Sequence, residues 1–541
     1  MTDFTMLSAR AEEWARTLTA IPSVTGTVDE ASFADRLAGL LSASPAFAEP
    51  HAVWTHPVPG GPHPRRCVLA LRRGSGARTV VLTGHFDIVE TSCYGALEPL
   101  ALDPDPLASG LIETIAREPH DARSARANAD LEAGDFLPGR GLLDMKGGLA
   151  AGLAAIEALH SEGFAGNLLF LAVPDEEGNS AGARTMSHAL PVIAAERGLE
   201  IAAVVNLDAT GDEGDGEDGR VVMLGSVGKL LPSALVVGRA AHVADSFRGF
   251  GAAALAGALA AEMEWAPELT ERTGDETGAG PTLLGMKDTK RVYDVTMPAS
   301  VWMYWNVALH RRSPEAVMRA VEAAAARAAE RLVASLAERA AASGVAPARD
   351  EVVVLRHADL MAEVTADPAQ AEELGRLETE LETSGISLPD RCGLVAQRLW
   401  ALSGRSGPAI VLGFASIPYL PVELGDGEAA TRLHRAVDAA IAETVAEAGQ
   451  SIRTIRFFPG ISDMSFFGEA DERHVATIAG NTPLWGSILA GAERFGSAGY
   501  PAVNAGPWGR DYHTRLERMH APYAFEILPR LLMRIARNVA G

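Results

Sequence analysis

Two adjacent glutamates and a histidine with an aspartate close by are the residues whose types and spacing point most directly to chemistry. Glu176 and Glu177 follow an apolar run, where their like charges repel unless a cation or a shared proton compensates. His85 and Asp87 lie two apart at the end of another apolar run, so Asp87 can orient the imidazole from its far nitrogen. Imidazole and carboxylate groups bind zinc-type metals, and a neighbouring glutamate can act as a general base. Taken alone, the glutamate pair fits an exposed acidic turn about equally well.

The elements that must position these groups alternate between short apolar runs and helical segments, a pattern typical of an α/β fold. Asp144 stands just before an Ala- and Leu-rich helix whose first glycines permit close packing on a sheet. Three apolar runs end in potential ligands, the third of them in Asp208: 79–83, 168–173 and 201–205. Open α/β sheets bind ligands at the carboxyl ends of their strands, so these runs predict one shared site.

Composition narrows the class of protein and its partners. The 70 acidic residues against 47 basic ones give a net charge of −23, which disfavours nucleic acid as a partner. The three cysteines lack C-x-x-C spacing, so neither a disulfide framework nor a thiolate zinc site is indicated, and a reducing cytoplasm fits best. The first residues predict an amphipathic helix and not a signal peptide, and no apolar run is long enough to span a membrane.

A length of 541 residues favours two domains, with one of them inserted in the other. Beyond Leu224 the pattern predicts a separate α+β unit, which ends in a closing strand near residue 356. Its other expected elements are a strand within 225–242, a helix at 247–264, a strand at 300–310 and a helix at 313–343. The predicted domains are therefore a first catalytic part (1–225), an inserted lid (226–356) and a second catalytic part (357–541), which takes in the apolar run 409–415.

Phosphoryl or nucleotide chemistry on an α/β sheet is a competing enzyme class, and it needs a glycine-rich phosphate loop. The segment GSVGK at 225–229 has part of such a loop. Leu230, however, occupies the place where a Ser or Thr hydroxyl should meet magnesium. Nucleotide binding is therefore disfavoured.

Five motifs in order distinguish this chain from an arbitrary α/β protein. They are TGHFD (83–87), GRGLLDMKGG (139–148), PDEEGNS (174–180), VVNLD (204–208) and GRDYHTRLERMH (509–520). In this order they resemble the dizinc metallopeptidases and deacylases of clan MH, a group that includes aminoacylase, acetylornithine deacetylase, peptidase T and glutamate carboxypeptidase. In length and motif wording the chain looks closest to the branch of the bacterial arginine-utilisation protein.

The resemblance implies a fold and a set of metal ligands. The fold would be α/β, a mixed-sheet zinc-peptidase catalytic domain with helices on both faces, plus an inserted α+β lid and dimerisation domain. Two divalent ions would be bound, zinc being expected and cobalt, manganese or nickel being alternatives. His85, Asp144 and Asp208 would hold one ion, and Asp144, Glu177 and His513 would hold the other. The family also tends to have a cis peptide bond after the shared aspartate, here between Asp144 and Met145.

The resemblance also implies an activity, which is hydrolysis of an amide bond in a small peptide or N-acyl amino acid. A water bridging the two metals would be activated by Glu176, with Asp87 orienting His85. His242, in GRAAHVADSFRGFGAA, would reach the active site of a partner subunit in a homodimer formed through the lid, and stabilise the oxyanion there. A structural histidine at a strand end is the competing interpretation of His242. The competing function is a non-catalytic metal-binding or dimeric assembly protein that retains the fold.

Overall fold

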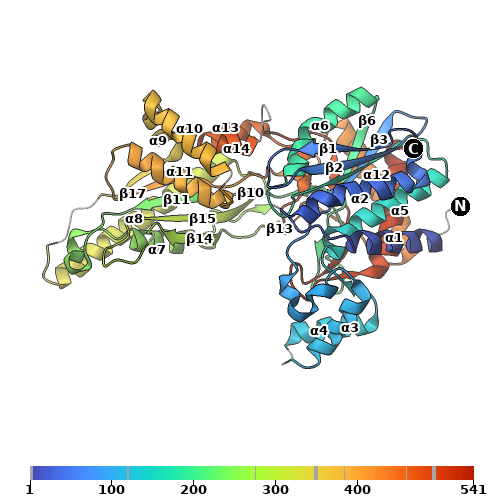
Figure 1. Ribbon diagram of the computed structural model, residues 1–541, viewed down its shortest axis with the longest axis horizontal. Coiled ribbons are helices and arrows are strands. Elements are labelled where there is room, and N and C mark those ends of the chain that lie inside the picture. The colour runs from blue at the N-terminus through green and yellow to red at the C-terminus, as the bar shows by residue number, and fades with distance from the viewer. Residues whose placement is uncertain are drawn as a thin grey trace. The chain divides into compact units, whose positions relative to one another are not determined.

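The computed structural model describes residues 4–118, 121–273, 276–290, 292–346, 351–382, 384–458, 460–489 and 495–541 (Figure 1). Within these ranges the chain divides into two compact units. The first unit comprises Met1–Ser226, Val422–Ala470 and Gly496–Gly541. The second unit comprises Val227–Pro421 and Asp471–Phe495.

The first unit is built on an eight-stranded sheet. In spatial order its strands are β1 (Val53–Val58), β2 (Arg65–Arg72), β5 (Asn167–Val173), β3 (Arg78–His85), β6 (Glu200–Asn206), β20 (Ala502–Asn504), β8 (Val221–Met223) and β19 (Arg453–Ile455). Strand β3 pairs in parallel with both β5 and β6, whereas β2 pairs antiparallel with both β1 and β5. The predicted mixed sheet is therefore confirmed.

Helices cover both faces of this sheet, as predicted. One face is covered by α1 (Phe4–Thr19), α2 (Val28–Ala43), α5 (Gly147–Ser161), α12 (Glu428–Ala448) and α15 (Leu528–Ala540). These helices and the sheet share one buried core, in which Phe33 of α2 stacks on Phe86. Helix α6 (Ala181–Arg197) packs against β1 and β6, on the other side of the sheet from α1 and α5 in Figure 1.

A smaller sheet and two extra helices complete the part of the first unit that concerns function. The small sheet has the order β4 (Phe136–Pro138), β22 (Arg518–His520), β21 (Trp508–Arg510) and β7 (Thr210–Gly211). Helices α3 (Pro104–Ile115) and α4 (Ala122–Ala133) form their own apolar cluster with Leu516, which follows β21. The loop that carries His513 thus runs from β21 back to β22.

The second unit contains a six-stranded sheet with helices. Its strands are β10 (Gly228–Leu230), β15 (Ser300–Leu309), β11 (Pro232–Val237), β17 (Ala409–Phe414) and β16 (Val353–Arg356), with β14 (Thr282–Asp288) also paired to β15. Its longer helices are α7 (Ala252–Met263), α8 (Pro314–Ala342), α9 (His357–Thr365), α10 (Pro368–Glu382) and α11 (Leu388–Leu402). Figure 1 draws α7 and α8 on one side of this sheet and α9 and α11 on the other. As the sequence predicts, Ser313 caps α8, accepting a hydrogen bond from the Ala316 amide at 3.2 Å.

The second unit is larger than the predicted inserted domain of 226–356. It begins close to the predicted boundary but runs on to Pro421 and takes up Asp471–Phe495. The apolar run 409–415, which the pattern assigned to the first domain, forms β17 in the middle of the second unit's sheet, between β11 and β16. A buried strand carries no information about which of two sheets it joins, so this pairing is decided by tertiary contacts.

Among the described helices of both units, none combines the length and the hydropathy required to cross a bilayer.

Candidate metal centre

Three adjacent strands of the large sheet bring potential ligands to one edge. His85 is the last residue of β3, and the turn with Glu176 and Glu177 follows β5. Asp208 stands two residues beyond the end of β6. Because β5, β3 and β6 run in parallel, their carboxyl ends lie together. The predicted convergence of these strand ends is what the structure shows.

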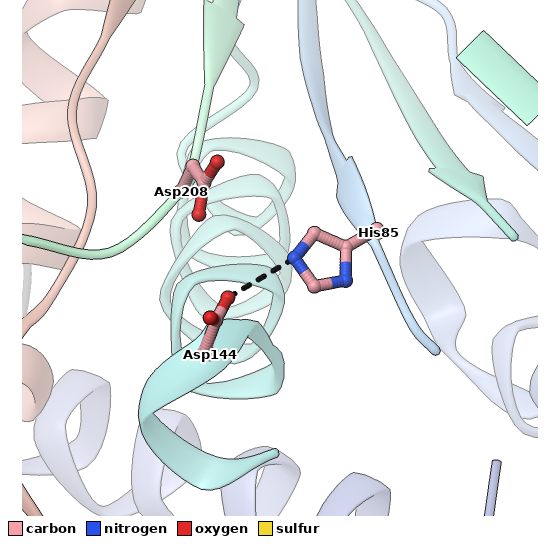
Figure 2. Close-up of side chains that lie close together, drawn as sticks. All are labelled: His85, Asp144 and Asp208. Carbon is pink, nitrogen blue, oxygen red and sulfur yellow. Dashed lines mark hydrogen bonds and ion pairs between the residues drawn. The ribbon is translucent and has the colours of Figure 1, made fainter. Parts of the chain in front are cut away.

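The first group of possible ligands consists of His85, Asp144 and Asp208. Each offers one ligand atom, and these atoms all lie within 4.8 Å of one another. Nε2 of His85 is 3.1 Å from Oδ1 of Asp144, and Figure 2 shows Asp208 facing this pair from the end of β6. An imidazole and two carboxylates at this spacing match the ligands that zinc-type ions take.

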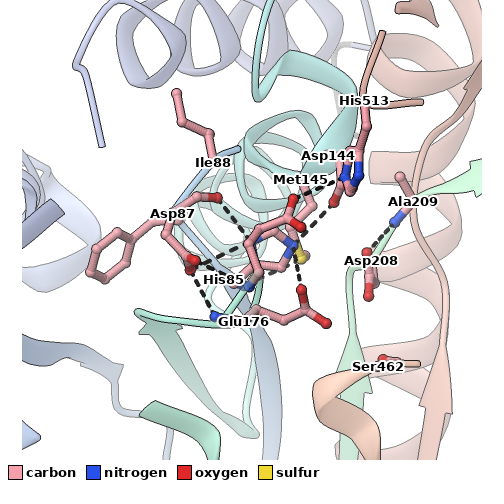
Figure 3. Close-up of polar contacts among 12 residues, drawn as sticks. His85, Asp87, Ile88, Asp144, Met145, Glu176, Asp208, Ala209, Ser462 and His513 are labelled. Carbon is pink, nitrogen blue, oxygen red and sulfur yellow. Dashed lines mark hydrogen bonds and ion pairs between the residues drawn. The ribbon is translucent and has the colours of Figure 1, made fainter. Parts of the chain in front are cut away.

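The second group consists of Asp144, Glu177 and His513, again within 4.8 Å of one another. Nε2 of His513 is 3.2 Å from Oδ2 of Asp144 and 3.1 Å from Oε1 of Glu177. The two oxygens of Asp144 therefore face different histidines (Figure 3). All five residues predicted as ligands are brought together, in the two sets that the family resemblance implied.

Asp144 lies in the turn Leu142–Lys146, which leads directly into α5, and its own backbone is not helical, with a φ of −116° and a ψ of 98°. The peptide bond between Asp144 and Met145 is cis, as the resemblance implied. Gly148 at the start of α5 permits the close approach of helix and sheet, since a Cβ there would lie 2.0 Å from the carbonyl oxygen of Leu207. The glycines after Asp144 thus serve the packing that the sequence predicts.

Asp87 makes different contacts from those expected. Nδ1 of His85 is 3.0 Å from the backbone carbonyl oxygen of Asp87 and 3.7 Å from its carboxylate. When Nδ1 donates to this carbonyl, Nε2 is left with its lone pair toward Asp144. The carboxylate of Asp87 instead accepts the amide hydrogens of Glu176 at 3.1 Å and Glu177 at 3.2 Å (Figure 3). Asp87 therefore orients the imidazole through its main chain and the glutamate turn through its side chain.

Glu176 lies beside both groups without belonging to either. Its side chain is 13% exposed, and Oε2 is 4.0 Å from Nε2 of His85. The carboxylate therefore lies beside His85 without a short contact to it.

The charges of the site suit a divalent cation. Burial, together with the nearby carboxylate of Asp144, raises the pKa of Asp208 to about 8. Burial and the same neighbour raise the pKa of Glu177 as well. Hydrogen bonds to Asp144 and Glu177 raise the pKa of His513 to about 10. Crowded carboxylates that repel one another are what a bound cation neutralises, so the residues present fit the metal that the donor set suggests.

Asn504 is a positioning residue that no sequence motif predicts. Its side chain, at the end of β20, accepts the amide hydrogen of Asp208 at 3.1 Å and donates to the carbonyl oxygen of Asp208 at 2.7 Å. It also accepts a hydrogen bond from Asn206 at 2.9 Å. The backbone of Asp208 is thus held from both sides by a residue almost 300 positions away, with no local pattern to indicate it.

A buried layer of charged side chains lies beneath the glutamate turn. Arg65 of β2 forms an ion pair with Asp175, the residue just before Glu176. Asp175 has a φ of 71°, a left-handed conformation that is uncommon outside glycine. Oε1 of Glu30 is 3.9 Å from Nη1 of the same arginine, and Oε2 accepts the Gly26 amide hydrogen at 2.7 Å. Burial, followed by the charge of Asp87, raises the pKa of Glu30 to about 8.

We expect Glu30→Gln to stabilise the protein at alkaline pH. A carboxyl whose pKa is raised to about 8 contributes stability below its ordinary pKa and loses it as the pH rises through 8. Glutamine cannot ionise and keeps an acceptor for Gly26. The variant should therefore match wild type near pH 4 and exceed its free energy of unfolding at pH 9 by on the order of 2 kcal/mol.

Thermal unfolding of both proteins from pH 4 to pH 9 measures this difference, with exposed Glu49→Gln as the control. A melting-temperature difference between Glu30→Gln and wild type that does not change with pH would contradict the assignment.

His242 lies in the second unit, at an exposed position. It forms an isolated β-bridge with Thr296, and its Nδ1 accepts the Ala244 amide hydrogen at 3.2 Å. It caps the short 3₁₀ helix η4 (Val243–Arg248), so a local structural role is evident. Its exposure leaves Nε2 available for a further contact.

Comparisons with known proteins agree with the geometry. Residues 114–487 match Peptidase family M20/M25/M40. Over 519 residues the chain is 29% identical to the uncharacterized protein YqjN of Bacillus subtilis, covering 94% of this chain and 92% of that protein. Over 543 residues it is 28% identical to protein RocB of the same organism, covering 97% and 94%. A tripeptidase from Staphylococcus aureus shares the fold, with a TM-score of 0.53 at 14% identity over 98% of each chain. The resemblance deduced from the five motifs is thereby confirmed.

Proposed function

The chain belongs to peptidase family M20/M25/M40 and is a metal-dependent hydrolase, and from this premise we propose that it cleaves the amide bond of a small peptide or N-acyl amino acid. The observation that carries the proposal is the sharing of Asp144 between two groups of ligands, with Glu176 beside both. A cytoplasmic location is part of the proposal and rests on the three unpaired cysteines.

Two divalent ions would be held at this centre. His85, Asp144 and Asp208 would bind one, and Asp144, Glu177 and His513 would bind the other, so both ions would share Asp144 as a ligand. Zinc suits these ligands, and cobalt, manganese and nickel take the same donor types. When bound, the ions supply Lewis acidity that makes a water more acidic and a substrate carbonyl more electrophilic.

The residues of the chain divide the remaining work. Glu176 accepts a proton from the attacking water and returns it to the nitrogen of the leaving amine when the carbon–nitrogen bond breaks. The Asp87 carboxylate accepts the amide hydrogens of Glu176 and Glu177, which fixes the position of the base, Glu176, relative to the ligand, Glu177. Asn504 holds Asp208 in the same manner. Each of these contacts fixes a group before substrate arrives.

A homodimer formed through the second unit belongs to the same proposal. His242 lies next to a group of exposed apolar side chains, and the amide of Val243 donates to the carbonyl oxygen of Val295 at 3.0 Å. The group comprises Val243, Phe247, Val292, Tyr293 and Val295, each at least 48% exposed. Neighbouring exposed apolar residues are typical of a protein–protein interface, and this one would carry His242 to the active site of a second copy.

A mixed dimer tests whether His242 acts in the partner. We expect Glu176→Gln and His242→Ala to be impaired when each is prepared alone. A heterodimer of the two, purified through separate tags, should recover about half of the wild-type turnover, because one of its two sites then combines an intact base with an intact histidine. No recovery in the purified heterodimer would place His242 at the active site of its own subunit, and wild-type turnover of His242→Ala alone would place it outside the mechanism.

Metal content and hydrolysis measured together test the function itself. Purified protein reconstituted with zinc should hold about two ions per chain and hydrolyse members of a panel of dipeptides and N-acyl amino acids. Bound metal without turnover on the panel would favour the non-catalytic metal-binding alternative. Absence of bound metal would overturn the proposed centre.

A further inference from the structure

The segments that carry Asp144 and His513 meet a second time, away from the ligand atoms. Arg140 lies four residues before Asp144, and Glu517 lies four residues after His513. Nη1 of Arg140 is 2.6 Å from Oε2 of Glu517, and their side chains are 1% and 0% exposed. A buried ion pair therefore joins the same two segments that the second group of ligands joins.

Glu517 acts directly on the backbone of His513. The oxygen that faces Arg140 also accepts the amide hydrogen of His513, at 2.8 Å. His513 has a φ of 57°, and Asp511, two residues earlier, has a φ of 59°. Non-glycine residues seldom adopt this left-handed conformation unless nearby contacts hold them in it. The Glu517 carboxylate supplies such a contact at the residue whose ring must face Asp144.

Arg140 is itself fixed from several sides. Its Nη2 donates to the carbonyl oxygen of Thr514 at 3.4 Å and contacts Sγ of Cys93 at 3.0 Å. Its guanidinium lies over the ring of Tyr94, 5.4 Å from the centroid, and its amide donates to the carbonyl oxygen of Ala101 at 2.8 Å. Arg140 thus touches the turn after His513 at Glu517 and at Thr514.

A buried ion pair contributes little net stability, because removing two charges from water offsets their attraction. Its directional contacts nevertheless specify one arrangement of the groups it joins. Here those groups are the turn that presents His513 and the segment that leads to Asp144. The pair is therefore suited to setting the distance between these two ligands.

We propose that Arg140 and Glu517 are positioning residues for the metal held by Asp144, Glu177 and His513. This inference rests on the proposed two-metal function and adds a selectivity to it. Loss of the pair weakens the site that contains His513 and leaves the site of His85, Asp144 and Asp208 in place. Both residues act through His513 and touch neither metal nor substrate.

Zinc titration of the metal-free protein against a chromophoric chelator tests the proposal. Wild type should show two binding steps. In Glu517→Gln we expect one step to weaken by about 10- to 100-fold, as for other partners of metal ligands, and the other to change by less than about twofold. If Glu517→Gln folds poorly, Glu517→Asp takes its place in this test. This variant keeps the charge but shortens the side chain, and we expect the same selective loss.

Glu157→Gln is the matched control. Glu157 also forms an ion pair in the first unit, with Arg10 at 2.7 Å, and its further side-chain contact is Ser44. The Glu157→Gln variant should bind both ions as wild type does. Two unchanged steps in Glu517→Asp and Glu517→Gln would overturn the positioning role while leaving the function intact. A wild type without two zinc steps would instead overturn the two-metal function on which this inference rests.

Discussion

Replacing Glu176 with glutamine should lower kcat by about 10²- to 10⁴-fold, the range that a general base contributes. Glutamine has nearly the shape of glutamate but cannot accept the proton of the attacking water. Glu176 belongs to neither group of ligands, so the variant should retain the metal content of wild type. Turnover on the best substrate of the panel and elemental analysis of the same preparation measure both effects.

The control for this experiment is Glu196→Gln, which makes the same chemical change at an exposed position of α6. It should behave as wild type in both measurements. Loss of metal from Glu176→Gln would show that Glu176 is a ligand. Retained turnover would remove it from the mechanism and leave the base unassigned.

Replacing Asp144 with asparagine should empty both metal sites. Its two oxygens face His85 at 3.1 Å and His513 at 3.2 Å, so neither group is complete without them. Although burial opposes its ionisation, hydrogen bonds from His513 and His85 keep the pKa of Asp144 below its ordinary value. An uncharged amide at this position would lower affinity for each ion by more than the roughly 10- to 100-fold effect of an outer partner.

Asp208→Asn is the informative comparison, because Asp208 belongs to the first group alone. It should lose about one ion per chain where Asp144→Asn loses about two. Metal analysis after equilibration at a fixed free zinc concentration distinguishes these outcomes. Equal loss in both variants would mean that the two ions bind as one cooperative unit, and an unchanged content in Asp144→Asn would exclude it as a bridge.

Much of the first unit can be predicted from the sequence, because the patterns that mark its strands and ligands are local. A parallel strand buried on both faces must be an apolar run, so a polar residue directly after such a run marks the edge of the sheet where ligands bind. His85, Glu177 and Asp208 each follow this pattern, and the structure places them together. The helix that begins after Ser313 was predictable for the same reason, because a capping residue and a helical period are both patterns of residues close together in the sequence.

His513 could be predicted from the sequence only through the family motif that contains it. Nothing near it in the sequence marks it as a ligand, and it was assigned only because its motif completed a family pattern. Its partner Asp144 lies 369 residues earlier, and the contact exists because β21 returns the chain to the same edge of the first unit. A separation of this size leaves no periodic signal.

The class of chemistry follows from the sequence alone. It contains imidazole and carboxylate ligands, a further glutamate next to one of them, and apolar strands that end at these residues. Tertiary structure alone decided which groups hold the ligands in place. The carboxylate of Asp87 binds the glutamate turn, Asn504 holds Asp208, and Glu517 with Arg140 holds His513. It also decided that β17 joins the second unit's sheet. The physical reason is common to all four: a buried polar group or an apolar strand requires a partner, but its own residue type does not say which distant segment will supply it.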